Sequence, residues 1–224
     1  MKILALDTSS TACSIAILIN DTVKESHQLA PMQQAQLILP MIDELLSSAA
    51  LKLDQLDAIA FGCGPGSFTG VRIATSVAQG LGFAAKVPLI PISSLAAIAQ
   101  AAYADLGWKK LLVAIDARVQ EIYWGAYRVN PQGLVELLGK EKVSSPADLA
   151  IPDTDEWYGI GNAWEVYRAQ IHCQPVNVDI NRLPMASAIL TLARDKFIKR
   201  DWVEAGRALP SYLRDEVAKK SQKG

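Results

Sequence analysis

The chain has 224 residues, half of them hydrophobic, which is enough to bury one large core or two small ones and excludes a disordered protein. Its 22 basic and 23 acidic residues leave a net charge of −1, so no overall positive field would attract nucleic acid, and any role on RNA would need a partner. The three cysteines and two histidines lack the local spacing of a zinc site or a disulfide framework.

The first half of the sequence alternates between strand and helix patterns. Apolar and alternating runs predict a meander of three strands, at residues 3–6, 12–19 and 22–29. The elements that follow are a helix, a strand, a helix and a strand, at residues 37–50, 58–61, 68–83 and 89–92. Ser93 then caps a helix that runs to Leu106 and ends at Gly107. The predicted order is βββαβαβα.

The second half of the sequence begins the same order again. An apolar strand pattern at 111–116 ends in Asp116, as the first strand ends in Asp7. Strands are then predicted at 122–129, 134–142 and 156–160, and helices at 146–150, 163–171 and 185–199. The repeated order favours duplication over coincidence. We expect an N-terminal domain at residues 1–108 and a reduced, loop-rich C-terminal domain at residues 109–224.

A glycine-rich stretch joins the strand at 58–61 to the helix at 68–83. It comprises Gly62, Gly64, Pro65, Gly66, Ser67, Phe68, Thr69 and Gly70. Its backbone N–H groups would lie at a helix N-terminus, where anions bind. It is not a P-loop, because no Gly-Lys-Ser/Thr follows, and not a dinucleotide-binding fingerprint, because Ser67 replaces the third glycine. A tight structural turn is the favoured interpretation, and ligand binding is the alternative.

Two turns after strands carry an aspartate, one in each half. In a two-lobed fold they would face each other across a cleft, where hydroxyls and amides hold phosphate and an aspartate holds a metal. The alternative is that Asp7 and Asp116 merely end their strands. The second turn, Asp116-Ala117-Arg118, lacks the hydroxyls and glycines of a phosphate loop. At most half of a nucleotide site is therefore expected, a vestigial turn at Asp7, Thr8 and Ser9.

The two central helices of the first half are apolar around most of their circumference. Between residues 68 and 85 the polar breaks are Arg72, Thr75, Ser76 and Gln79. Such a helix is either covered on both sides by its own chain or half covered by another chain. Composition does not distinguish these two alternatives.

Several motifs resemble the TsaB (YeaZ) family. They are Ile3-Leu-Ala-Leu-Asp7-Thr-Ser9, Leu39-Pro40-Met41-Ile42, Gly62-x-Gly-Pro-Gly-Ser-Phe-Thr-Gly-Val-Arg-Ile73, Ile115-Asp116-Ala-Arg118 with Glu121-Ile-Tyr123-Trp124, and Tyr212-Leu-Arg214. The resemblance spans nearly the whole chain and is densest over residues 1–125. It implies an α/β fold of the duplicated ribonuclease-H-like (actin/hexokinase-like, ASKHA) type, with two lobes that each contain a mixed sheet and flanking helices.

The resemblance also implies a function. Members of the family are non-catalytic scaffold subunits of the bacterial complex that attaches a threonylcarbamoyl group to N6 of the tRNA adenosine next to the anticodon. The implied partners are the catalytic paralogue TsaD and the ATPase TsaE, with a homodimer when the subunit is alone, and tRNA is met only within the complex. The resemblance further implies that two helices form the partner interface, for which we expect Leu37, Met41, Val71, Arg72, Thr75, Ala78 and Gln79. On this basis Ala78→Arg should block partner binding without unfolding the chain.

Ligands and location complete the expectations from sequence. In the catalytic paralogue two histidines hold a metal, whereas the matching stretch here, Gln33 to Leu37, has none, and neutral amides bind transition metals poorly. We expect no cofactor or metal in this chain, and ATP/ADP and a metal ion in the partner subunits. No apolar run reaches about eighteen residues, so a cytoplasmic location without membrane contact is expected.

Two alternative functions are a self-sufficient kinase or ATPase of the actin-like fold, and a homodimeric binding protein outside tRNA modification.

Overall fold

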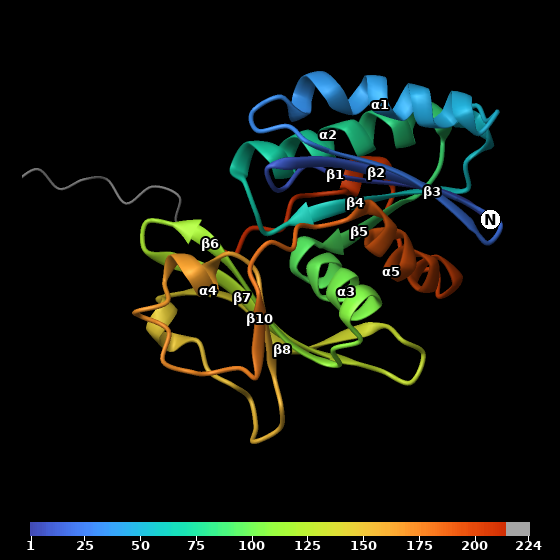
Figure 1. The fold of residues 1–224 in the computed structure, drawn as a ribbon. Coiled ribbons are helices and arrows are strands. Elements are labelled where there is room, and N and C mark those ends of the chain that lie inside the picture. Colours follow the sequence, from blue (N-terminus) through green and yellow to red (C-terminus); the bar gives the residue numbers. More distant parts are fainter. Residues whose placement is uncertain (214–224) are drawn as a thin grey trace, which may run out of the picture.

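Two five-stranded sheets form the centre of the computed structural model, which describes residues 1–213 (Figure 1). Arg214 of the Tyr-Leu-Arg motif lies outside the described residues. The first sheet contains β1 (Lys2–Asp7), β2 (Ala12–Ile19), β3 (Thr22–Leu29), β4 (Ala58–Gly64) and β5 (Leu89–Ser93), in the order β3-β2-β1-β4-β5. The second sheet contains β6 (Lys110–Arg118), β7 (Glu121–Val129), β8 (Val135–Ser144), β9 (Tyr158–Ile160) and β10 (Asn177–Asp179), in the order β10-β9-β6-β7-β8.

Both sheets have the same topology, which confirms the predicted duplication. In the first sheet β1 pairs antiparallel with β2 and parallel with β4. In the second sheet β6 pairs antiparallel with β7 and parallel with β9. Each lobe is thus an antiparallel meander extended by two parallel strands, the expected ribonuclease-H-like arrangement. The sequence prediction missed β10, whose three residues lie in the loop-rich part of the second half.

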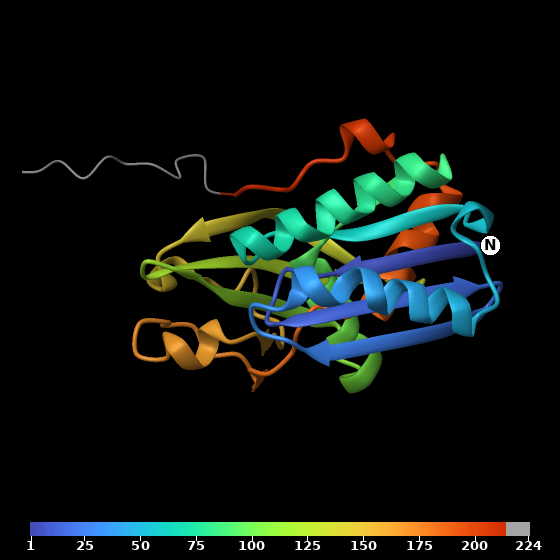
Figure 2. The same cartoon turned by 90° about the horizontal axis from the view of Figure 1, so that it is seen from above.

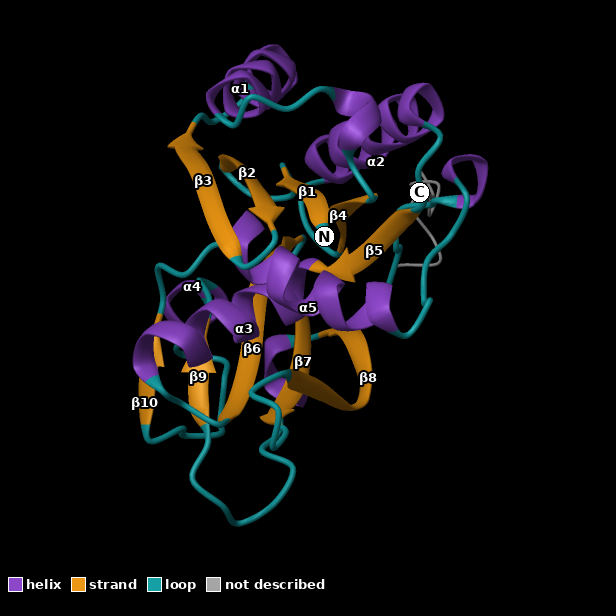
Figure 3. Ribbon diagram, turned by 90° about the vertical axis from the view of Figure 1, so that its right-hand side faces the viewer, coloured by secondary structure: helices purple, strands orange, loops and turns teal. Residues whose placement is uncertain are grey.

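Helices cover both faces of the first sheet. α1 (Gln34–Ser48) and α2 (Phe68–Ala85) lie side by side on its outer face. α3 (Ser94–Leu106) and α5 (Ala186–Ile198) lie between the two sheets, as Figure 1 and Figure 3 show. α4 (Ala163–Val166) packs against β6 and ends earlier than predicted, and short 3-10 turns occur at Leu53–Gln55, Pro146–Asp148 and Ala205–Arg207. Among residues 1–213, no helix combines the length and the apolar character needed to cross a membrane.

The period of two along β1 explains why this sheet is covered twice. Leu4 and Leu6 point to the face that α1 and α2 cover, where they share a buried cluster with residues of both helices. Ile3 and Ala5 point to the opposite face, where they pack with residues of α5. A strand buried on both faces has a continuous apolar sequence rather than an alternating one. The first sheet is therefore the central layer of its lobe.

The end of the described chain returns to the first sheet. α5 packs on β1, β2, β4 and β5, although its sequence lies in the second half. The segment after it, residues 201–213, is called the C-terminal strap below; it runs along the side of α2 away from α1 (Figure 2). Val203 and Leu89 exchange backbone hydrogen bonds of 2.8 Å. The expected division at residue 108 thus separates the two sheets, while α5 and the strap, beyond that boundary, pack on the first lobe.

A polar cluster joins the second sheet to the start of α3. The hydroxyls of Ser93 and Tyr127 both donate to the carboxylate oxygen Oε1 of Glu141. Burial raises the pKa of the Glu141 carboxyl, and the two hydrogen bonds oppose that effect. The Ser93 oxygen also accepts from the backbone N–H groups of Leu95 and Ala96 as the N-cap of α3. The two lobes therefore meet through satisfied polar groups as well as through apolar contacts.

Candidate partner surface

The glycine-rich stretch closes over the turn that follows β1. Gly62 and Gly64 end β4, and Phe68, Thr69 and Gly70 form the first turn of α2. The Ser67 N–H donates to the Ser9 carbonyl at 2.7 Å, and the Thr8 hydroxyl donates to the Gly70 carbonyl at 2.6 Å. The residues predicted as a vestigial nucleotide turn, Asp7, Thr8 and Ser9, are brought together here and are buried.

Two glycines permit this close approach of backbone to backbone. A Cβ atom at Gly70 would lie 1.9 Å from the Thr8 carbonyl oxygen, and one at Gly66 would lie 2.5 Å from the Ser9 carbonyl oxygen. The Gly70 N–H donates to the hydroxyl oxygen of Ser67, the N-cap of α2, at 3.4 Å. Because this chain's own oxygens accept from the Ser67 and Gly70 N–H groups, the contacts favour the structural interpretation of the glycine-rich stretch over anion binding.

Asp7 is a buried carboxylate at the junction of β1, β4 and α3. Its Oδ1 accepts from the backbone N–H of Ser9 at 2.8 Å and from the Ser9 hydroxyl at 2.9 Å. The Ser94 hydroxyl donates to Oδ2 at 3.4 Å. Burial raises the pKa of Asp7 to about 6, against the opposing effect of these hydrogen bonds. The side chain therefore holds the turn together from within.

Asp7→Asn is expected to remove a pH dependence of stability. The raised pKa means that the folded chain retains a proton that the unfolded chain releases. The contribution of Asp7 to stability is therefore greatest in acid and is lost as the pH rises through about 6. Between about pH 5 and about pH 7.5, the free energy of unfolding of the wild type should fall by roughly 1 kcal/mol relative to that of the variant. Urea unfolding at both pH values measures this difference, and a difference that stays constant would contradict the burial of an ionisable Asp7.

The corresponding turn of the second lobe has different contacts. Asp116 Oδ1 accepts from the Arg118 N–H and from the Tyr167 hydroxyl, both at 2.8 Å. Arg118, Val119 and Gln120 all have positive φ, so the tip of the β6–β7 hairpin is left-handed without a glycine. Among residues 1–213, no group of three or more His, Cys, Asp and Glu side chains is placed to hold a metal ion.

The predicted interface residues divide between the core and the surface. Four lie on the inner sides of α1 and α2 and are at most 7% exposed: Met41, Val71, Thr75 and Ala78. Their prediction as contact residues is corrected, because these side chains fill the core of this chain beneath the helices. The other three, Leu37, Arg72 and Gln79, are partly exposed, and their role in a contact stays a prediction. The Gln79 amide donates to the Ala208 carbonyl of the strap at 2.8 Å.

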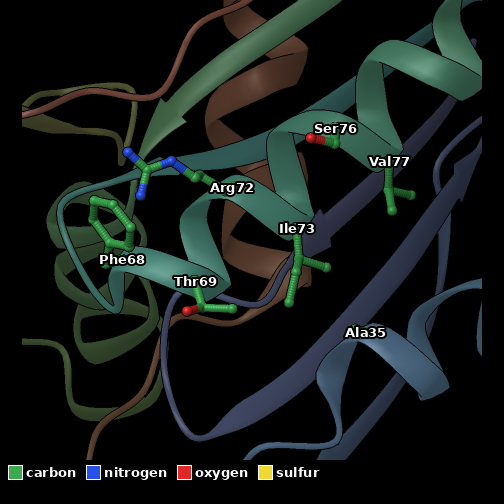
Figure 4. Close-up of a pocket in the computed structure, with 7 residues that line it drawn as sticks. All are labelled: Ala35, Phe68, Thr69, Arg72, Ile73, Ser76 and Val77. Carbon is green, nitrogen blue, oxygen red and sulfur yellow. The ribbon is translucent and has the colours of Figure 1, made fainter.

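A groove of about 390 Å³ lies between α1 and α2 (Figure 4). Its lining is mainly apolar and consists of Ala35, Phe68, Thr69, Arg72, Ile73, Ser76 and Val77. Thr69, Ile73 and Val77 point toward Ala35 across the groove, while the Arg72 side chain extends over Phe68 at one end (Figure 4). The two helices thus bury one side against the first sheet and leave an apolar face exposed.

Large exposed apolar side chains occur on both helices and just before α1. Met32 before α1 is 95% exposed, Leu39 on α1 is 52% exposed, and Phe68 and Phe83 on α2 are 55% and 79% exposed. Exposed large apolar residues on neighbouring helices are typical of an interaction site. Sequence reasoning missed Ala35, Ile73, Ser76 and Val77 as surface residues, because a helix that is apolar all round does not show which face is outward.

Comparisons with known proteins agree on one family. The family model for the tRNA N6-adenosine threonylcarbamoyltransferase TsaD matches residues 26–222. The tRNA threonylcarbamoyladenosine biosynthesis protein TsaB of Haemophilus influenzae is 39% identical, over 100% of this chain and 98% of that protein. TsaB of Escherichia coli is 35% identical, over 100% and 99%. The structure of YeaZ from Pseudomonas aeruginosa matches with a TM-score of 0.92 and 44% identity, over 95% of this chain and 99% of that one. The chain therefore belongs to the TsaB (YeaZ) family.

Proposed function

We propose that this protein is a non-catalytic subunit of the machinery for tRNA threonylcarbamoyladenosine biosynthesis, and that it binds a TsaD-type catalytic subunit through α1 and α2. The observation that carries the proposal is the exposed apolar face of these helices, with its groove and with Phe68 and Phe83 more than half exposed. Burial of such a face against another protein is favourable at about 25 cal/mol per Å² of apolar surface. The pathway is inferred from the relatives of Haemophilus influenzae and Escherichia coli, which are named for tRNA threonylcarbamoyladenosine biosynthesis.

The side chains that would otherwise suggest catalysis support the subordinate role. Burial raises the pKa of Cys13 to about 11 and that of Cys63 to about 12, so neither thiol is an available nucleophile at neutral pH. The turn at Asp7 is filled by the glycine-rich stretch, and Asp116 is tied to Tyr167. These contacts disfavour the alternative of a self-sufficient kinase or ATPase, which needs an open phosphate turn.

The proposal assigns the other components of the reaction to other proteins. ATP or ADP and a metal ion bind in the partner subunits, and a TsaE-type ATPase joins the complex. The net charge of −1 fits a protein that meets tRNA only after assembly. In the absence of the catalytic subunit, the same apolar face pairs with a second copy of this chain. The proposed compartment is the cytoplasm, where tRNA is modified.

Reconstitution of the reaction tests this function. Threonylcarbamoylation of tRNA is measured with the catalytic subunit, the ATPase subunit and an enzyme that supplies threonylcarbamoyl-AMP, in the presence and absence of this chain. We expect product only when this chain is added to the others, and none from this chain alone. ATP turnover by the isolated chain is measured in parallel as the test of the kinase alternative. Full modification without this chain, or modification by this chain unassisted, would show that the proposal is wrong.

A further inference from the structure

Arg72 lies at one end of the groove and has a polar atom without a hydrogen-bond partner among the described residues. Its Nη1 nitrogen is buried and has no hydrogen-bond partner within residues 1–213. A buried guanidinium nitrogen without an acceptor is unfavourable, because it has lost its water and gained nothing in exchange. Such an atom in a native protein calls for an explanation, and an acceptor supplied by another molecule is one.

Two aromatic rings hold the guanidinium in place. Its Cζ atom lies 3.2 Å from the centroid of the Phe68 ring and 5.2 Å from that of the Tyr212 ring. Aromatic faces attract the positive charge but accept no conventional hydrogen bond, so the two rings leave the Nη1 donors unsatisfied. A guanidinium whose position is already fixed by two rings loses little side-chain entropy when its planar set of N–H donors binds a carboxylate.

The C-terminal strap fixes the position of one of these two rings, that of Tyr212. The Ser211 N–H donates to the Cys63 carbonyl at 2.7 Å, which fixes the strap one residue before Tyr212. The hydrogen bond from the Gln79 amide to the Ala208 carbonyl fixes the strap at a second point, nearer to α5 in the sequence. Tyr212 therefore reaches Arg72 from a segment more than a hundred residues away, and the strap thereby positions the groove's positive charge.

The charge pattern of the two helices shows what would complete this site. Arg72 is the single cationic residue in the sequences of α1 and α2, and it adjoins the apolar groove side chains Ile73 and Val77. A partner that covers the groove would exclude water from the guanidinium, and an anionic acceptor would then be worth more than a neutral one. Arg forks match the geometry of carboxylates.

We propose that Arg72 is a preset anchor for a carboxylate side chain of the protein that docks in the α1–α2 groove, and that Tyr212 of the strap is its positioning residue. The inference rests on the proposed function, in which that protein is the TsaD-type catalytic subunit. It adds to that function the chemistry by which the partner is recognised: an aspartate or glutamate that meets a guanidinium held between two rings.

The test measures the dissociation constant of the complex with the catalytic subunit by calorimetry, at low and at high salt. Arg72→Gln should weaken binding by about 30-fold or more and should reduce its salt dependence. Arg72→Lys keeps the charge without the planar fork and should recover part of the loss. Tyr212→Ala should weaken binding by roughly 3- to 10-fold, and Tyr212→Phe, which keeps the ring, should restore most of that binding.

A matched control removes a cation at the opposite end of α2 from Arg72. Lys86→Gln neutralises the exposed residue that follows α2 and should leave affinity and salt dependence unchanged. Melting temperatures confirm that every variant is folded. If folded Arg72→Gln binds the catalytic subunit as tightly as the wild type, Arg72 is not an anchor for the partner, although the proposed scaffold function stands. If the wild type itself does not bind, the proposed function fails first.

A second copy of this chain is the competing source of the carboxylate, since Asp43 and Glu44 are exposed on α1. Sedimentation of the isolated chain tests it. If Arg72→Gln abolishes self-association but leaves the affinity for the catalytic subunit unchanged, the anchor serves the homodimer and the proposal is overturned.

Discussion

Gly70→Ala is expected to destabilise the protein by on the order of 3 kcal/mol. The added methyl group would lie 1.9 Å from the Thr8 carbonyl oxygen, a backbone atom that cannot turn aside as a flexible side chain can. The first turn of α2 would have to move away from the β1 turn, breaking the hydrogen bond from Thr8 to the Gly70 carbonyl. Alanine is otherwise the better helix former, so the intrinsic propensity favours the variant and the measured loss is smaller than the cost of the contact itself. Urea unfolding at neutral pH measures the effect.

Gly80→Ala is the matched control on the same helix. Apart from its own helix backbone and its two chain neighbours, no described atom lies within 4 Å of the position that its Cβ would occupy. The substitution should therefore stabilise the chain by roughly 0.5 to 1 kcal/mol, through helix propensity. Equal effects at the two positions would show that the glycine-rich stretch does not pack against the turn as described.

Ser76→Arg and Ala78→Arg are expected to fail in different ways, although they lie two residues apart on α2. Ser76 is exposed in the groove, so an arginine there leaves the fold intact and introduces an unpaired charge where the partner docks. Binding of the catalytic subunit should weaken by about 100-fold or more. Ala78 is fully buried, so an arginine there would place a guanidinium in the core and unfold the chain, at a cost of more than about 4 kcal/mol.

Thermal unfolding and calorimetric titration of both variants separate the two effects. Ser76→Arg should melt within a few degrees of the wild type and bind the catalytic subunit about 100-fold or more weakly. Ala78→Arg should give little folded protein at all. This result would replace the expectation from sequence that Ala78→Arg blocks binding in a folded chain. A normal complex with Ser76→Arg would remove the groove from the contact.

The order of elements was predictable because each element carries its own local signal. The alternating and apolar runs gave the meanders, and Ser93 and Gly107 marked both ends of α3. The glycine-rich stretch was correctly placed between a strand and a helix, because glycine and proline interrupt both periodicities. α4 was predicted too long and β10 was missed, because elements of four and three residues give only a weak periodic signal.

The sequence by itself determined the duplicated fold and the family, because hydrophobic periodicity and the glycine motif are properties of short stretches of chain. Only the tertiary structure decided which residues of α1 and α2 face outward, since two helices that are apolar all round show no preferred face until a sheet covers one. Only the tertiary structure revealed the contact between Gly70 and Thr8 and the contact between Tyr212 and Arg72. These contacts join residues 62 and 140 positions apart, and no local pattern encodes an approach that depends on how the whole chain packs.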